Sequence, residues 1–333
     1  MAISPAAQTD NRIVGLDGIR GLATLVVIYA HLGLLGFGWV AMESFFVLSG
    51  FLITRVLLHD QAVAPSFGIY LKRFYLRRVL RVFPVYYGYL LVLTLLLPVL
   101  PAEDEIGRQL PYAYSYVFNF FILFDAHQGT KLLDHLWSMC VEEQFYLIWP
   151  LLIAMLPGRK AVWALVALLI LAPASRYWVM VQWPSVPGDG LIDNPYLAIY
   201  FLTSSHLDAF AIGALLNYFT FRPRVWHLMV VLALTVAAGV AASGWGLRPY
   251  VPGGDVLNFG WPMSLPRGGQ SVWGYSLINL NCALLIAACC QPGPLQRFFQ
   301  WRPLEFVGER SYPTYVFHYA ILMLFMPARQ WLT

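Results

Sequence analysis

Three residues in an otherwise apolar stretch, residues 13–35, could do chemistry together: Asp17, Arg20 and His31. A helix turns by about 100° per residue, so the eleven steps from Arg20 to His31 return to within about 20° of the starting direction. Asp17 falls within about 40° of His31, and Arg20 and His31 are separated by about 16 Å along the axis. An ionisable side chain near the middle of a bilayer costs about 2.5–3.5 kcal/mol, so such residues usually face a protein interior or a watery cavity. The pattern predicts one wall of an active site.

A second candidate is the basic segment 72–81, which carries five Lys or Arg residues where a membrane-spanning segment begins. Arg78 and Arg81 are one helical turn apart, so both guanidinium groups can converge on one anion. Arginine suits phosphate because its planar fork donates two parallel hydrogen bonds. The alternative is that these residues only set the topology or touch anionic lipid. The segment by itself leaves both interpretations open.

A third candidate lies in the apolar segment 136–156, which contains Glu142 and Glu143. Ser138, Glu142 and Tyr146 follow one another at four-residue intervals and therefore line one helix face. Adjacent carboxylates point about 100° apart on a helix, so Glu142 and Glu143 cannot serve the same pocket equally. A buried Glu suits proton transfer, but an ion pair to a neighbouring helix would also explain its presence.

Further polar or small residues interrupt other apolar segments, and each of them alone could simply support helix packing or a helix–helix hydrogen bond. For Ser49 and Gly50, packing is the favoured interpretation. Taken together, these segments mix the side chains that move protons and bind phosphate. The residues are Ser49, Gly50, His206, Asp208, Ser311, Tyr315 and His318.

The composition identifies the kind of element that must position these residues. The 333-residue chain is 59% hydrophobic and 11% charged, against about 45–50% and about 25% in soluble domains. We therefore predict an all-α, polytopic integral membrane helix bundle, with residues 1–333 as a single domain. The net charge of +4 comes from basic residues grouped in short loops, which indicates topology signals rather than nucleic-acid binding. The cysteine spacing and the absence of known cofactor motifs predict no metal site and no tightly bound cofactor.

About ten segments are long and apolar enough to be crossings. They lie near residues 13–35, 38–58, 82–100, 111–127, 136–156, 161–180, 196–220, 226–246, 271–291 and 311–328. Basic residues place the chain start and the 72–81 segment in the cytoplasm, but the same rule applied from the other end disagrees by one crossing. The parity is restored if 111–127, which is aromatic and broken by Asn119, is re-entrant or interfacial. Nine crossings and an external C-terminus would then follow.

Six stretches of this sequence together resemble the membrane-bound acyltransferase family 3, which contains bacterial sugar O-acetylases and O-acyltransferases. They are LDGIRGLATLVVIYAH, WVAMESFFVLSGFLIT, YLRRVLRVFPVYY, LWSMCVEEQFYLIWP, HLDAFAIGALL and VGERSYPTYVFHYAIL. The family's Arg-x10-His hallmark falls on Arg20 and His31, and its Arg-x-x-Arg motif on Arg78 and Arg81. Its Ser-x-x-x-Glu-x-Gln-Phe-Tyr pattern runs from Ser138 to Tyr146, and its last motif runs from Ser311 to His318. One departure is His206, where members often have Arg ahead of Asp208.

The resemblance implies acyl-CoA, often acetyl-CoA, as donor and a carbohydrate or sugar-bearing acceptor at the bacterial cytoplasmic membrane. It leaves the oligomeric state open. Many relatives append a hydrolase-like domain outside the membrane. Because this chain ends at Thr333, we expect transfer to be completed within the membrane domain.

On this basis we predict catalytic roles for His31, Arg20 and Glu142. His31 would be the general base on an acceptor hydroxyl, and Glu142 would orient His31 or shuttle a proton. Arg78 and Arg81 would hold donor phosphates at the cytoplasmic side. The supporting residues are Asp17, Ser49, Ser138, Tyr146, Asp208, Tyr315 and His318.

Two other functions are compatible with the polar residues. A proton-coupled secondary transporter also uses intramembrane His, Glu and Arg, although no inverted repeat is visible in the sequence. A non-catalytic membrane scaffold would leave the polar face of the first segment unexplained.

Overall fold

The computed structural model describes residues 13, 15–100, 103–124, 130–183, 194–243, 259–261 and 269–325. These residues are helical and contain no strand, which confirms the all-α prediction for the described part of the chain. The longer helices are α1 (Leu16–His31), α2 (Val40–Val63), α3 (Phe67–Leu96), α7 (Trp137–Met155), α8 (Arg159–Gln182), α11 (Val225–Ser243), α12 (Gln270–Cys289) and α15 (Ser311–Leu324). Shorter ones are η2 (Leu97–Val99), α4 (Glu103–Tyr114), α5 (Phe118–Phe124), α6 (Lys131–Asp134), α9 (Pro195–Phe201), η3 (Thr203–His206), α10 (Leu207–Leu215), α13 (Pro294–Phe299) and α14 (Arg302–Glu309).

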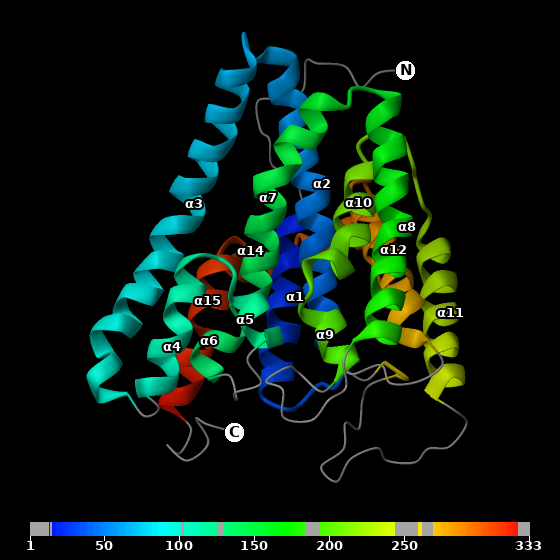
Figure 1. Cartoon of the computed structure of the whole chain (residues 1–333). Helices are drawn as coiled ribbons and strands as arrows, with labels where there is room; N and C mark the ends of the chain where they lie inside the picture. The colour runs from blue at the N-terminus through cyan, green and yellow to red at the C-terminus, as the bar shows by residue number, and fades with distance from the viewer. Residues whose placement is uncertain are drawn as a thin grey trace.

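Glycines bring helix backbones into direct contact at the centre of the bundle, where α1 and α2 lie (Figure 1). A Cβ atom on Gly50 of α2 would lie 2.1 Å from the carbonyl oxygen of Phe210, and one on Gly213 of α10 would lie 2.0 Å from that of Val47. Small residues allow such close approach of membrane helices. The packing interpretation of Gly50 is therefore confirmed.

The first helix is held in the same way against the short helices near the chain end. A Cβ atom on Gly18 would lie 1.8 Å from the Phe299 carbonyl oxygen, and one on Gly21 would lie 2.0 Å from that of Leu304. The rotation of α1 about its axis is thereby fixed against α13 and α14. That rotation decides which way Arg20 points.

The outer helices expose apolar surface that suits lipid. Five helices are long and apolar enough to cross a membrane, namely α2, α3 extended by η2, α8, α11 and α12. A sixth crossing results if α9 is joined to η3 and α10, a pair bent by 71°. The chain is therefore a multi-pass membrane protein, but the predicted count of about ten is not confirmed.

The segment 111–127 is not one helix in the described residues. It divides into the end of α4 and the separate helix α5, with Tyr116 between them at φ 54°. At 1.5 Å per residue, α4 and α5 extend over about 18 Å and about 11 Å, which is too short for a 30 Å hydrocarbon core. This segment therefore does not cross the bilayer as a single helix; its residues 125–127 lie outside the described part.

The two ends of the bundle differ in charge. The ends of α2 and α7 and the starts of α3 and α8 lie together at one end, whereas α1 runs toward the other (Figure 1). Lys72, Arg73, Arg159 and Lys160 lie at or near the first end, in the opening turns of α3 and α8. His31, the last residue of α1, then lies toward the opposite side.

Candidate active site

A pocket of about 700 Å³ opens between α1, α2, α3, α7 and α15, and we call it the arginine pocket. Most of the residues predicted from the sequence to act together line it. Its polar lining consists of Arg20, Ser49, Arg78, Arg81, Ser138, Glu142, Tyr146, Ser311, Tyr312 and Tyr315.

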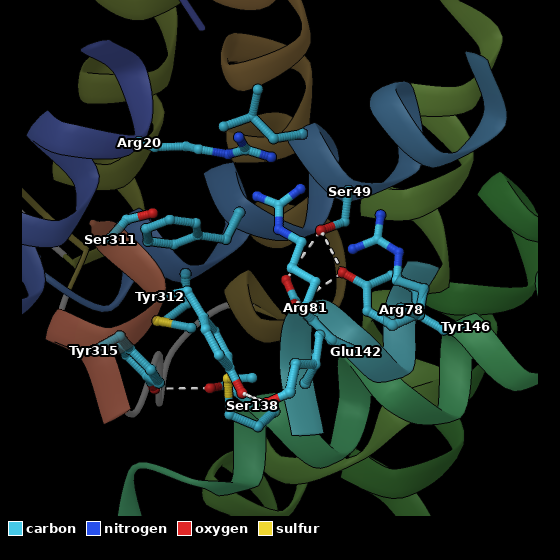
Figure 2. Close-up of a pocket in the computed structure, with 15 residues that line it drawn as sticks. Arg20, Ser49, Arg78, Arg81, Ser138, Glu142, Tyr146, Ser311, Tyr312 and Tyr315 are labelled. Atoms are coloured by element: carbon cyan, nitrogen blue, oxygen red, sulfur yellow. Dashed lines mark hydrogen bonds between the residues drawn. The ribbon is translucent and has the colours of Figure 1, made fainter. Parts of the chain in front are cut away.

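Three guanidinium groups give this pocket its charge. Arg20 and Arg81 point toward each other, with Arg78 alongside (Figure 2). Arg20 donates a hydrogen bond to Asp17 over 3.2 Å, and the Arg78 guanidinium carbon lies 4.5 Å from the centre of the Tyr146 ring. Within the described ranges, neither Arg78 nor Arg81 forms an ion pair with a carboxylate. Since Glu142 is the one carboxylate among the described lining residues, this lining has excess positive charge and suits an anion.

Glu142 is held by two hydroxyl groups. Its Oε1 accepts a hydrogen bond from Ser49 over 3.0 Å, and its Oε2 accepts one from Tyr146 over 3.1 Å. The two hydroxyl oxygens are themselves 3.2 Å apart. The lining includes Glu142 and not Glu143, as expected from their angular separation on the helix.

Ser138 and Tyr315 close the side of the pocket toward α15. Their hydroxyl oxygens are hydrogen-bonded to each other over 2.7 Å and lie 3.1 Å and 2.8 Å, respectively, from the backbone carbonyl oxygen of His135, so one hydroxyl donates to the other and the second donates to the carbonyl. The dashed line between Ser138 and Tyr315 in Figure 2 marks this contact. The two side chains are buried, so this wall is fixed by a satisfied hydrogen-bond group.

His31 lies outside the lining of the arginine pocket and forms a pair with His318. Nδ1 of His31 is 2.7 Å from Nε2 of His318. Nδ1 of His318 is 2.5 Å from the carbonyl oxygen of Tyr315, whose side chain lines the pocket. The structure therefore links His31 to the pocket through two residues of α15. Glu142 is hydrogen-bonded to Ser49 and Tyr146, whereas the side chain hydrogen-bonded to His31 is that of His318.

Asp208 belongs to a different place in the bundle, which we call the buried ion cluster: Glu43, Arg176, His206, Asp208, Ser276 and Asn279. Arg176 uses all five of its N–H donors there, on Asp208 twice, on Ser276, and on the carbonyl oxygens of Ser205 and Val272. The side chains of Arg176 and Asp208 are 0% and 1% exposed. Asp208 is thus separated from the other predicted site residues.

Sequence reasoning missed Arg176, although a single Arg inside the apolar segment 161–180 was a usable signal. The second pair of the cluster is His206 with Glu43, whose Nδ1 and Oε1 lie 2.8 Å apart with both side chains fully buried. His206, the position at which the family resemblance fails, therefore contacts a carboxylate on α2. In the described part of the chain, no group of three His, Cys, Asp or Glu side chains is arranged to hold a metal ion.

Comparison with known proteins decides the family. A family model described as an acyltransferase domain matches residues 13–329. The chain belongs to this acyltransferase family. This match confirms the resemblance seen in the sequence. No solved structure matches it.

The names of three relatives indicate the chemistry found among similar proteins. The chain is 28% identical over 97% of its length to the putative peptidoglycan O-acetyltransferase YrhL of Bacillus subtilis. It is 28% identical to the O-acetyltransferase OatA of Staphylococcus aureus over 93% of its length, and to the peptidoglycan O-acetyltransferase OatA of Listeria monocytogenes over 95%. The matches cover 50% of each relative, so the chain spans about half the length of the curated relatives it matches. These findings give no support to the transporter alternative.

Proposed function

We propose that this acyltransferase transfers an acyl group, most simply acetyl, from acyl-CoA to a hydroxyl group of a carbohydrate or glycosylated acceptor at the bacterial cytoplasmic membrane. The observation that carries this proposal is the arginine pocket, where two arginines with no ion-paired carboxylate among the described residues lie beside a hydroxyl-bound Glu142. The pocket is joined by Tyr315 and His318 to an imidazole. The acceptor class rests on the relatives whose names refer to peptidoglycan.

The donor is bound through its phosphate groups by Arg78 and Arg81. Both guanidinium groups lie in a single pocket, and charge-assisted hydrogen bonds to phosphate are about twice as strong as neutral ones. Arg20, held by Asp17, has its guanidinium in the same pocket. It orients the donor or stabilises negative charge that develops on the thioester carbonyl oxygen.

His31 acts as general base on the acceptor. It removes the proton from the acceptor hydroxyl while the oxygen attacks the thioester carbonyl carbon. The carbon–sulfur bond then breaks, and the CoA thiolate takes the proton back from the imidazolium. Glu142 is available for proton movement within the pocket, since it already accepts from two hydroxyl groups.

The two substrates approach from opposite sides of the membrane. Arg78 and Arg81 follow the basic first turns of α3, from whose end of the bundle acyl-CoA would enter. His31 is half-buried and is followed by the exposed residues Leu32, Gly33 and Leu34 at the other end, where an external carbohydrate would arrive. In this arrangement the donor, bound at Arg78 and Arg81, extends its thioester along the polar face of α1 toward His31.

The test is an acyl-transfer assay with the purified protein in liposomes, using labelled acetyl-CoA and soluble peptidoglycan fragments, with mass spectrometry of the ester product. His31→Ala and Arg20→Ala should each lower turnover by a factor of about 10²–10⁴ while the protein stays inserted and folded. Full activity in His31→Ala would exclude the proposed base. If no acetylated carbohydrate forms and another acetylated species appears instead, the acceptor must be reassigned.

A further inference from the structure

The hydrogen bonds around His318 determine where its proton lies. Nδ1 of His318 is 2.5 Å from the carbonyl oxygen of Tyr315. A carbonyl oxygen can only accept a hydrogen bond, so this nitrogen carries the proton. His318 is only 3% exposed and is surrounded by the rings of His135, Tyr315 and Tyr319. Burial of this kind favours the uncharged imidazole, which has one N–H and one lone pair.

The second nitrogen of His318 then determines the proton of His31. Nε2 of neutral His318 has the lone pair and must accept in the 2.7 Å contact with Nδ1 of His31. The ring planes differ by 11°, and the ring centroids are 4.9 Å apart, so the two nitrogens face each other between the rings. Nδ1 of His31 is therefore the donor. Nε2 of His31 is left without a proton.

We propose that His318 is a positioning residue that holds His31 in the tautomer whose Nε2 is an unprotonated base. This inference rests on the proposed function, because only a base needs that lone pair. The direction of both hydrogen bonds is set by the Tyr315 carbonyl oxygen, a group that cannot change its role. The series of hydrogen bonds runs from the Tyr315 carbonyl oxygen through His318 to His31. It therefore ends at Nε2 of His31, the nitrogen that meets the acceptor hydroxyl.

The same chain assists the proton-transfer step. When Nε2 of His31 takes the acceptor proton, Nδ1 keeps its own proton and still donates to His318, so the positive charge on His31 is stabilised by a charge-assisted hydrogen bond. The proton on Nε2 then passes to the CoA thiolate. The step therefore requires no oxidant, no reductant and no co-reactant besides the two substrates.

The direct test reads the tautomer without any assay of activity. Nitrogen-15 NMR of the histidine-labelled protein in lipid, with His31 assigned by comparison with His31→Ala, should show a protonated Nδ1 and an unprotonated Nε2. The opposite tautomer at His31 would overturn the proposal. Because this result does not depend on turnover, it separates failure of the proposal from failure of the proposed function.

Two substitutions test the consequence for turnover. His318→Phe keeps the aromatic ring but cannot accept, and it should lower kcat by a factor of about 10²–10⁴ with the KM for acetyl-CoA unchanged, because the arginine pocket is intact. His318→Gln can accept from His31 through its amide oxygen and donate to Tyr315 through its amide nitrogen, so it should recover at least tenfold of the lost rate.

His135→Phe is the matched control. It changes a neighbouring imidazole whose ring centroid is 4.9 Å from that of His318, but whose Nε2 donates to the Val316 carbonyl oxygen. It should leave the tautomer of His31 unchanged. Wild-type kcat in His318→Phe, or a greater loss in His318→Gln than in His318→Phe, would overturn the positioning role. If His318→Phe does not fold, the NMR result for the unsubstituted protein still decides.

Discussion

Two groups of charged residues lie inside this bundle and have opposite properties. In the arginine pocket, Arg78 and Arg81 have no carboxylate partner among the described residues, and the surrounding space is open. In the buried ion cluster, every N–H of Arg176 is used and the side chain is completely buried. Both groups are costly in an apolar bundle, but the guanidinium groups of Arg78 and Arg81 have hydrogen-bonding capacity left for a substrate, whereas that of Arg176 has none.

The difference shows how an intramembrane charge can be assigned to function or to structure. A guanidinium whose donors are all satisfied by the protein cannot bind a phosphate without breaking those bonds, and it acts as a crosslink between helices. Arg176 of α8 joins α10 through Asp208 and α12 through Ser276. A guanidinium with free donors in an open pocket is available for a ligand. The presence of Arg in an apolar segment does not by itself distinguish the two.

The same substitution at one arginine of each group should give the largest contrast. Arg176→Met leaves Asp208 as an uncompensated buried charge and should lower the free energy of unfolding by about 3–5 kcal/mol. Arg81→Met should leave stability unchanged and raise the KM for acetyl-CoA by a factor of about 10–100, since a charge-assisted phosphate contact contributes about 1.5–3 kcal/mol. Thermal unfolding in detergent and initial rates measure the two effects.

These two variants would contradict the comparison if their effects were exchanged. A stable Arg176→Met protein with weakened donor binding would place the buried ion cluster in the substrate site. An Arg81→Met protein that is unstable but has an unchanged KM for acetyl-CoA would show that Arg81 supports the fold rather than donor binding.

The sequence predicted the positions of α2 and α8 closely, because length and apolarity are local properties. The segment 38–58 corresponds to α2 (Val40–Val63) and the segment 161–180 to α8 (Arg159–Gln182). The segment 82–100 was too short, since α3 begins at Phe67. The first turns of α3 are basic, and an apolar window does not detect a helix that continues beyond the membrane.

The residues of the arginine pocket were predictable for a physical reason. Charged side chains in apolar segments are rare enough that Arg20 and Glu142 could be selected individually, whereas Arg78 and Arg81 were selected by their one-turn spacing in a basic segment. Their partners were not predictable, because pairing depends on how helices distant in sequence pack. His31 and His318 are 287 residues apart, and Arg176 and Asp208 are 32 apart on separate helices.

Helix α2 carries residues of both the arginine pocket and the buried ion cluster. A displacement of α2 should therefore lower both turnover and stability. A Cβ atom on Gly213 would meet the Val47 carbonyl oxygen at 2.0 Å, and Gly213→Ala should therefore cost about 1–3 kcal/mol of stability through overpacking. Because Ser49 and Glu43 both belong to α2, turnover should fall in the same variant. Gly88→Ala is the control: nothing lies within 4 Å of its Cβ position on α3, and neither quantity should fall. Loss of stability with unchanged turnover would show that the pocket does not depend on this contact.

A matched pair of serines provides the finest version of the comparison, with the smallest expected effect. Ser49 donates to Glu142 in the arginine pocket, and Ser276 donates to Asp208 and accepts from Arg176 in the buried ion cluster. One hydrogen bond contributes about 0.5–1.5 kcal/mol. Ser49→Ala should therefore lower turnover severalfold at unchanged stability, whereas Ser276→Ala should lower stability by about 1–3 kcal/mol, because it leaves a buried donor of Arg176 unsatisfied. Equal losses of stability in both variants would mean that the hydroxyl on Glu142 is as structural as the one on Asp208, and the division between the two groups would then not extend to their hydroxyl partners.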